Sequence, residues 1–170
     1  MRKRGAKMGI KKELKPITKA INKWTMKNFG IKTVLNTDFC AWCDEQKIGY
    51  SLFVGTQDAE TFLTDVSTRY PEIKADYFLW CLLHEIGHCM TDDLWTEEEQ
   101  DRFDEQLERM TEIDNTKEKS YWYYSMPNEF FATRWAGEYM EAHPKKMKKF
   151  WNKIQPMILE FYLKNNLTNE

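Results

Sequence analysis

The sequence has no long apolar segment, few cysteines and only three histidines among its 170 residues. No apolar run approaches the roughly 18 residues of a membrane-spanning helix, and the opening MRKRGAKMGIKKELK lacks the apolar core of a secretory signal. Without such a signal, the four cysteines are expected to be reduced thiols. These absences predict a soluble, cytoplasmic protein that does not associate with membranes.

The composition is that of one folded domain. Hydrophobic residues make up 42% of the chain and aromatic residues 15%, which excludes disorder throughout. The sequence shows no internal repeat, linker or low-complexity segment. We therefore expect one domain, with a basic N-terminal helix in residues 1–30, a core in residues 31–141 and a C-terminal helix in residues 142–170.

The small net charge of −2 hides a strong asymmetry along the chain. Residues 1–32 contain eleven lysines and arginines and one acid, whereas residues 92–118 contain twelve carboxylates and three bases. The two blocks could attract each other within the fold. Alternatively, residues 2–32 could form a basic arm that binds nucleic acid or another anionic partner.

The segment CAWC places Cys40 and Cys43 at the spacing of a zinc knuckle or a redox pair. A structural zinc site would need a second pair, but Cys81 and Cys89 are eight residues apart. We therefore expect all four cysteines to be small core residues.

Hydrophobic periodicity predicts an α+β fold that is mostly helical, with a small sheet early in the chain. Apolar residues at helical spacing fill residues 10–28 and 72–90, and Gly30 is expected to end the first of these helices. Alternating patterns predict two strands, in residues 32–42 and 47–55, around the turn DEQK.

The rest of the chain is expected to be largely helical. One helix should start near Ala59, another after the capping box of Thr96 and Glu99, and a third should run over residues 127–141 from a proline in its first turn. A break at residues 143–144 should precede the last helix. The stretch YWYYSM is expected to be a loop or a strand.

The motif HEIGH places two of the three histidines on one face of the 72–90 helix. His84 and His88 are four residues apart, so their imidazoles project from the same side and can reach a single ion. Glu85 lies about 100° around the helix, where it can take a proton from a water held by the ion. HExxH is a metallopeptidase signature for this reason. The simpler alternative is two surface histidines beside a solvated glutamate.

Two histidines leave a zinc ion one protein ligand short. An extended HExxHxxGxxH site would need a histidine where the chain has Leu94, so that class is excluded. Asp92 or Asp93 could be the third ligand only if the helix ended sharply after His88. His143, at a later helix break, is another candidate.

Glu129 is the strongest candidate for the third ligand. It shares a helical face with Ala132, Ala136 and Met140, and the two alanines would let this helix press closely against the HExxH helix. Gly87, which costs a helix about 1 kcal/mol relative to alanine, would make room for the same contact. The ordinary alternative is an exposed glutamate favoured by the helix dipole.

HEIGH followed by NEFFATRWA resembles the gluzincin zinc metallopeptidases, and in particular the compact ImmA/IrrE-type peptidases of phages and other mobile elements. The second motif of that family is similar to E-x-x-A-[ND]-R-[FWY]-A. The residues that match it are Glu129, Ala132, Arg134, Trp135 and Ala136. The resemblance spans roughly residues 31–141 and would place the protein in a host cytoplasm, or in a virion if it is encoded by a phage.

The resemblance implies peptide-bond hydrolysis with one zinc ion per chain, held by His84, His88 and Glu129, with Glu85 as the general base. Thr133 departs from the pattern, because the family usually has Asn or Asp there to bind a ligand histidine. That support is therefore expected from elsewhere.

Hydrolysis also needs a donor that stabilises the oxyanion of the transition state. Tyr124 is the first choice because it immediately precedes the turn into the ligand helix. The other candidates are Tyr121, Tyr123, Arg134 and His143.

The sequence thus favours a zinc metallopeptidase that cuts a protein or peptide, with the substrate strand paired against the edge of residues 48–54. The alternative is a zinc-binding structural or accessory protein with little or no turnover, associated with nucleic acid through its basic N-terminus. Glu85 favours the peptidase, because a structural site has no use for a base and would close with a fourth protein ligand.

Overall fold

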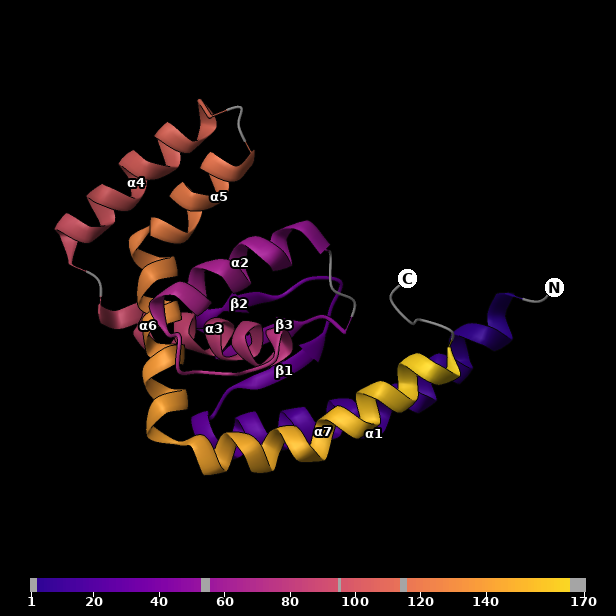
Figure 1. Ribbon diagram of the computed structural model, residues 1–170. Coiled ribbons are helices and arrows are strands. Elements are labelled where there is room, and N and C mark those ends of the chain that lie inside the picture. Colours follow the sequence, from indigo (N-terminus) through magenta and orange to yellow (C-terminus); the bar gives the residue numbers. More distant parts are fainter. Residues whose placement is uncertain (1–2, 53–55, 95, 114–115, 166–170) are drawn as a thin grey trace.

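The computed structural model describes residues 3–52, 56–94, 96–113 and 116–165, apart from the side chains of residues 3–12, 56–59, 116–117 and 120. The basic side chains expected to form an N-terminal arm therefore lie partly outside the described residues. Within the described ranges the chain forms a mostly helical α+β domain with one small sheet early in the sequence, as predicted (Figure 1). Its elements are α1 (Lys3–Phe29), β1 (Lys32–Leu35), β2 (Cys40–Trp42), the 3-10 helix η1 (Cys43–Glu45), β3 (Lys47–Tyr50), α2 (Thr56–Arg69), α3 (Tyr77–Thr91), the 3-10 helix η2 (Asp92–Leu94), α4 (Glu97–Thr111), α5 (Thr116–Ser125), α6 (Pro127–Ala142) and α7 (Pro144–Lys164).

The sheet has the strand order β1-β3-β2, with β1 parallel and β2 antiparallel to β3. The prediction of one strand over residues 32–42 is wrong, because the polar residues 36–38 separate two strands that lie on opposite sides of β3. The expected substrate edge over residues 48–54 is wrong as well. Ile48 and Gly49 on β3 pair on both sides, and residues 53–54 lie outside the described part. The open edge nearest to α3 belongs to β2.

Most of the predicted helix ends are confirmed. Gly30 ends α1 with a positive φ of 75°, which glycine adopts without strain. Thr96 and Glu99 form the complete capping box of α4, and Pro127 occupies the first turn of α6.

Two other assignments are corrected. The HExxH helix begins at Tyr77 rather than at residue 72, because the Asp76 side chain accepts a hydrogen bond from the amide of Phe78 and caps α3 there. The stretch from Tyr121 to Ser125 belongs to helix α5 rather than to a loop or strand. Its aromatic residues favour strands in isolation, but contacts of α5 with α2, α4 and α6 outweigh that preference.

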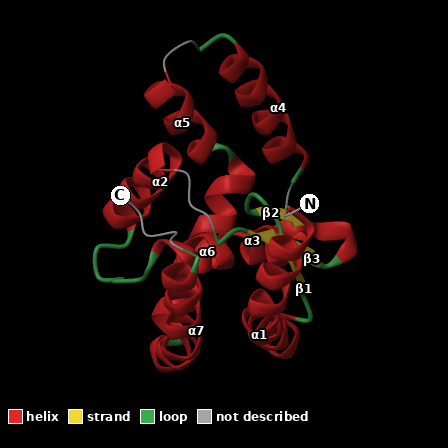
Figure 2. Ribbon diagram, turned by 90° about the vertical axis from the view of Figure 1, so that its right-hand side faces the viewer, coloured by secondary structure: helices red, strands yellow, loops and turns green. Residues whose placement is uncertain are grey.

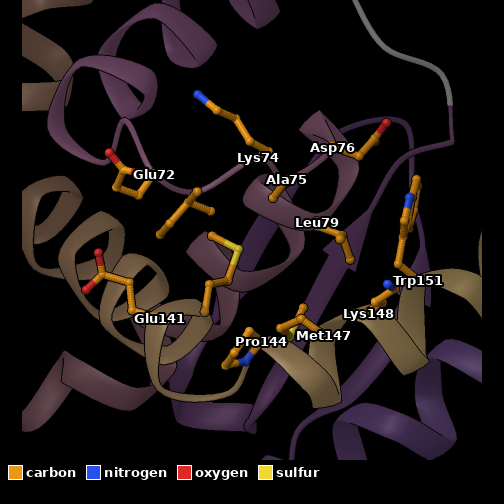
Figure 3. A pocket seen from close by; sticks show the side chains of 12 residues that line it. Glu72, Lys74, Ala75, Asp76, Leu79, Glu141, Pro144, Met147, Lys148 and Trp151 are labelled. Carbon is orange, nitrogen blue, oxygen red and sulfur yellow. The ribbon is translucent and has the colours of Figure 1, made fainter.

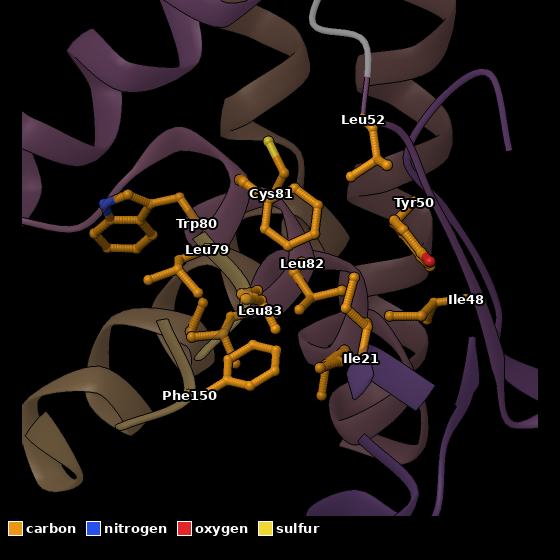
Figure 4. Packing of buried hydrophobic residues seen from close by; sticks show 14 of the residues in the cluster. Ile21, Ile48, Tyr50, Leu52, Leu79, Trp80, Cys81, Leu82, Leu83 and Phe150 are labelled. Carbon is orange, nitrogen blue, oxygen red and sulfur yellow. The ribbon is translucent and has the colours of Figure 1, made fainter. Parts of the chain in front are cut away.

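The core surrounds α3, which is buried along almost its whole length. Side chains from α1, the sheet, α3 and α7 pack together there; those labelled in Figure 4 are Ile21, Ile48, Tyr50, Leu52, Leu79, Trp80, Cys81, Leu82, Leu83 and Phe150. The helices α1 and α7 lie side by side along one side of this body, and α4 and α5 project from the opposite side (Figures 1 and 2). No helix in the described part is both long and apolar enough to cross a membrane.

Candidate metal centre

The HExxH helix α3 and the helix α6 make the most extensive contact of any two elements in the described structure. The two backbones lie in tight contact at Gly87, where the Cβ atom of any other residue would lie 2.4 Å from the carbonyl oxygen of Ala132. Ala132 and Ala136 are fully buried at 0% exposure. The predicted roles of these small residues are therefore confirmed: they allow α6 to press against α3.

This contact brings His84, His88 and Glu129 together, as the sequence predicted. The Nε2 atom of His84 lies 2.9 Å from Oε2 of Glu129 and 3.1 Å from Nε2 of His88, and Nε2 of His88 lies 3.5 Å from Oε1 of Glu129. Donor atoms around a tetrahedral zinc ion are about 3.3 Å apart. The three side chains therefore have the spacing and the chemistry to hold one metal ion.

Glu129 is only 3% exposed, so the alternative of a solvated first-turn glutamate is excluded. Burial alone would raise the pKa of Glu129, but its hydrogen bonds with His84 and His88 outweigh burial and hold the pKa well below its usual range. The same partner raises the pKa of His88, although burial opposes that shift. These contacts favour the anionic form of the glutamate between the two imidazoles, as a cation site requires.

Thr133 supports one of these imidazoles. Its Oγ1 atom lies 3.0 Å from Nδ1 of His84, and both residues are buried. The expectation that this support must come from elsewhere is therefore wrong: the threonine hydroxyl takes the position expected of an Asn or Asp side chain. When Nδ1 of His84 carries the proton, its N–H donates a hydrogen bond to Oγ1 of Thr133, and Nε2 keeps its lone pair for a metal.

Glu85 is also buried beside the cluster, and it lines a cavity of about 390 Å³ together with His88 and Glu129. Burial raises the pKa of Glu85, and the nearby histidines oppose the shift only in part. A carboxylate with a raised pKa, placed next to the metal ligands and facing a cavity, has the properties of a general base.

Tyr123, rather than Tyr124, faces this cavity. Burial raises the pKa of Tyr123, as do the charge of Glu129 and a hydrogen bond with it, so the phenol remains protonated. Tyr124 packs its ring on Phe62, at 5.4 Å between centroids, and lines a different cavity with Tyr121. The structure therefore places Tyr123 rather than Tyr124 at this cavity, because in α5 these neighbours point in different directions.

Asn128 is a cavity residue that the sequence motifs did not single out. Its Nδ2 atom lies 3.2 Å from Oε1 of Glu129, and its buried Oδ1 atom has no partner among the described protein atoms. An acceptor of this kind in a cavity wall suits the N–H group of a ligand. The sequence feature that could have pointed to Asn128 is its position directly before Glu129.

The other candidate residues lie elsewhere. Among the described residues, the one cluster with metal-ligand spacing excludes Asp92, Asp93 and His143. Asp92 lines the cavity at the end of α3, whereas His143 ends α6 and packs on Tyr139. Arg134 pairs with Glu138 on the exposed side of α6.

A second cavity, of about 490 Å³, lies near the C-terminal end of α6 and shares no lining residue with the cavity beside Glu85. Figure 3 shows its apolar centre, formed by Leu79 and Met147, and the charged side chains Glu72, Lys74 and Glu141 around it. It lacks a histidine, so it offers no zinc site of the HExxH kind.

The cysteines divide into two groups. Cys81 and Cys89 are buried, as expected of core residues, whereas Cys40 and Cys43 are half-buried and line the metal-site cavity. Cys40 and Cys43 are not joined in a disulfide: both are free, and Asn36 donates a hydrogen bond to Sγ of Cys40.

Comparisons of the chain with protein-family models, with curated proteins and with solved structures give no match. The function must therefore be argued from the geometry and chemistry of the site.

Proposed function

We propose that this protein is a zinc-dependent metallopeptidase, with His84, His88 and Glu129 as the ligands of one zinc ion per chain. The observation that carries the proposal is the position of Glu85, which stands beside a three-ligand cluster and faces an open cavity. A structural zinc site is closed by four protein ligands, whereas a catalytic one keeps a position for water or substrate. The resemblance of HEIGH and NEFFATRWA to gluzincin motifs supports the same activity.

The ligand atoms favour zinc over other common ions. Two imidazole nitrogens and one carboxylate form a ligand set typical of zinc peptidases, whereas magnesium and calcium prefer oxygen ligands alone. When bound, zinc supplies Lewis-acid polarisation and makes a water molecule acidic near neutral pH.

The residues of the chain would then perform the proton transfers. Glu85 accepts a proton from the attacking water and delivers it to the nitrogen of the leaving amine. Its raised pKa suits the first step, because it makes the carboxylate a stronger base than an ordinary glutamate. The Tyr123 hydroxyl, protonated and directed at the site, donates to the oxyanion that forms on the substrate carbonyl.

The cavity walls suit a peptide substrate in an extended conformation. The edge strand β2 supplies Cys40 and Ala41 to the wall, so an extended segment could add to the sheet there and pass the metal ligands. The unpartnered Oδ1 atom of Asn128 would accept a hydrogen bond from a backbone N–H of that segment. The proposed substrate is therefore an unfolded or loop segment of a protein.

The direct test is a proteolysis screen of a peptide library with zinc-loaded wild-type protein and with Glu85→Gln, read by mass spectrometry. The amide keeps the shape of the side chain but cannot take a proton, so turnover should fall by about 10²–10⁴-fold while zinc content is unchanged. Glu138→Gln, at an exposed position on α6, is the matched control and should keep full activity.

Cleavage by wild-type protein that persists in Glu85→Gln would show that another group is the base. A zinc-loaded wild-type protein that cleaves no peptide in the library would favour the alternative of a zinc-binding accessory protein.

A further inference from the structure

We propose that helices α1 and α7 together form a basic face that binds double-stranded DNA through the phosphates of its backbone. This inference is independent of the peptidase activity, because no described residue of α1 or α7 lines the cavity of the metal centre. The basic face consists of two rows of exposed lysines, which are Lys15, Lys19, Lys23 and Lys27 on α1 and Lys145, Lys149 and Lys153 on α7.

Each row follows one side of its helix. Successive lysines in a row are four residues apart, so they project from the same side of the helix at intervals of about 6 Å. The opposite side of each helix is buried, at Ile17 and Ile21 of α1 and at Ile154 and Ile158 of α7. The lysines of both rows therefore point away from the core and into solvent.

The two rows belong to one surface. Helices α1 and α7 run side by side along the same side of the molecule (Figures 1 and 2), and the rings of Trp24 and Phe150 stack between them with centroids 4.0 Å apart. Lys23 directly precedes Trp24, and Lys149 directly precedes Phe150, so the stacked rings place the two rows at the same level. The surface is therefore broader than an N-terminal arm, because α7 contributes to it as well.

The positive charge of the basic face is not neutralised within the described part of the fold. Helix α1 contains nine lysines and arginines and α7 contains six, against one glutamate in each helix. None of the seven lysines of the face forms an ion pair with a described residue.

The acidic block of the chain lies too far away to neutralise this face. Residues 92–118 belong largely to α4 and α5, which project from the opposite side of the molecule (Figure 1). The described residues show no ion pair between the two blocks. The basic face is therefore free for an anionic partner.

The chemistry of the face favours double-stranded DNA among such partners. A DNA duplex carries one phosphate charge for about every 1.7 Å of its axis, and regular rows of lysines match such a regular polyanion. Lysine binds phosphates as a point charge and does not read the bases.

Other anionic partners would need side chains that the basic face does not offer. Single strands bind through exposed aromatic rings, on which their bases stack. A membrane surface requires large apolar side chains beside the lysines. In residues 15–27 and 145–153, all of which the structure describes, Met26 is the only large apolar side chain that is exposed.

The test measures the binding of a fluorescently labelled DNA duplex by anisotropy, between about 50 and 200 mM salt. Each phosphate that a lysine neutralises contributes about −0.9 to the slope of log K against log salt concentration. We expect a slope of about −4 to −6 and equal affinities for two duplexes of unrelated sequence. A slope near zero, or a strong preference for one sequence, would overturn the proposal.

Two matched double variants locate the binding surface. Lys23→Gln/Lys149→Gln removes one lysine from each row, so DNA affinity at about 0.1 M salt should fall by about 25–100-fold and the salt slope should become less steep by about 2. Arg102→Gln/Lys119→Gln changes the net charge equally, at exposed positions on α4 and α5, and should bind DNA like the wild type. Equal affinities of the two double variants would show that DNA does not bind to the basic face.

Competition distinguishes DNA from the other possible partners. Phosphatidylserine vesicles and polyglutamate, each at the same concentration of negative charge, should displace the duplex only weakly. Displacement by either at a lower charge concentration than unlabelled DNA would contradict the choice of partner. Melting temperature and zinc content should be unchanged in both double variants, so a loss of DNA binding is distinguishable from a loss of the fold or of the metal centre.

Discussion

The Oγ1 atom of Thr133 lies 3.0 Å from Nδ1 of His84, so a side chain of α6 orients a ligand histidine of α3. The same helix carries Glu129, one turn earlier on the same side of the contact. Helix α6 therefore contributes twice to the proposed metal centre: it carries one of the three residues that could hold the ion, and it contacts the ring of another. A hydroxyl can accept the Nδ1 proton as an Asn or Asp oxygen would, although its shorter side chain requires the close approach at Gly87.

Removing that hydroxyl should weaken zinc binding without removing a ligand. Thr133→Val keeps the shape of the side chain but cannot accept the His84 proton, so zinc affinity should fall by about 10–100-fold. Thr133→Ser should retain most of the affinity. Competition with a chromophoric chelator measures both values.

Thr91 offers a control for this comparison, because it is also buried but its hydroxyl donates a hydrogen bond to the carbonyl of Gly87 rather than to a histidine. Thr91→Val should change thermal stability more than zinc affinity. Equal zinc affinities for Thr133→Val and wild type would show that the contact with His84 has no effect on the metal.

The contact between α3 and α6 should be sensitive to added volume. Gly87→Ala would place a methyl group 2.4 Å from the Ala132 carbonyl oxygen. The resulting strain should lower the free energy of unfolding by about 1–3 kcal/mol. The gain in helix propensity, about 1 kcal/mol, offsets only part of this loss. Ala132→Leu should act in the same way from the other helix.

Both substitutions should lower zinc affinity although neither removes a ligand, since they push Glu129 away from the histidines. Isothermal titration with zinc measures this loss, and chemical denaturation measures the free energy of unfolding. Normal zinc affinity in Ala132→Leu would contradict the steric role assigned to the small residues.

Tyr123 and Tyr124 should differ in their effect on catalysis. Tyr123 faces the cavity and contacts Glu129, whereas Tyr124 packs on Phe62. Loss of an oxyanion donor costs on the order of 10²–10³-fold in kcat. Tyr123→Phe should therefore show such a loss at unchanged zinc content, and Tyr124→Phe should remain active. The opposite ranking of the two variants in a steady-state assay would restore Tyr124 as the donor.

Zinc binding should be coupled to proton release. In the metal-free protein Glu129 raises the pKa of His88 against the opposing effect of burial, so His88 holds its proton up to a higher pH than a free histidine, whose pKa is about 6.5. Zinc must displace that proton. Affinity should therefore weaken as the pH falls through the raised pKa of His88 and level off above it.

Calorimetry in buffers with different enthalpies of ionisation counts the protons that zinc displaces. His88→Ala removes the group and should remove the released proton together with the tight binding. A zinc affinity that does not change with pH would contradict the assignment of His88 as a ligand.

The helical part of the centre could be predicted from sequence because local rules determine it. The spacing of His84 and His88 fixes their common face, and the alanines that follow Glu129 indicate a close helix contact. These signals depend only on helical periodicity, which is why the sequence could predict that His84, His88 and Glu129 lie together.

The parts that depend on tertiary contacts could not be predicted in the same way. Whether Tyr123 or Tyr124 faces the site depends on how α5 is rotated against α6, and the aromatic composition of that segment indicates a strand as readily as a helix. The central position of β3 follows from long-range pairing with β1, which the sequence pattern does not encode.

In the proposed centre, His84, His88 and Glu129 together bind one zinc ion. The most direct test is a crystal structure of the zinc-loaded protein with anomalous scattering recorded on both sides of the zinc absorption edge. We expect one zinc peak per chain, about 2.0–2.2 Å from Nε2 of each histidine and from a carboxylate oxygen of Glu129. A zinc peak at other residues, or a fully occupied site from which Glu129 is absent, would contradict this ligand set.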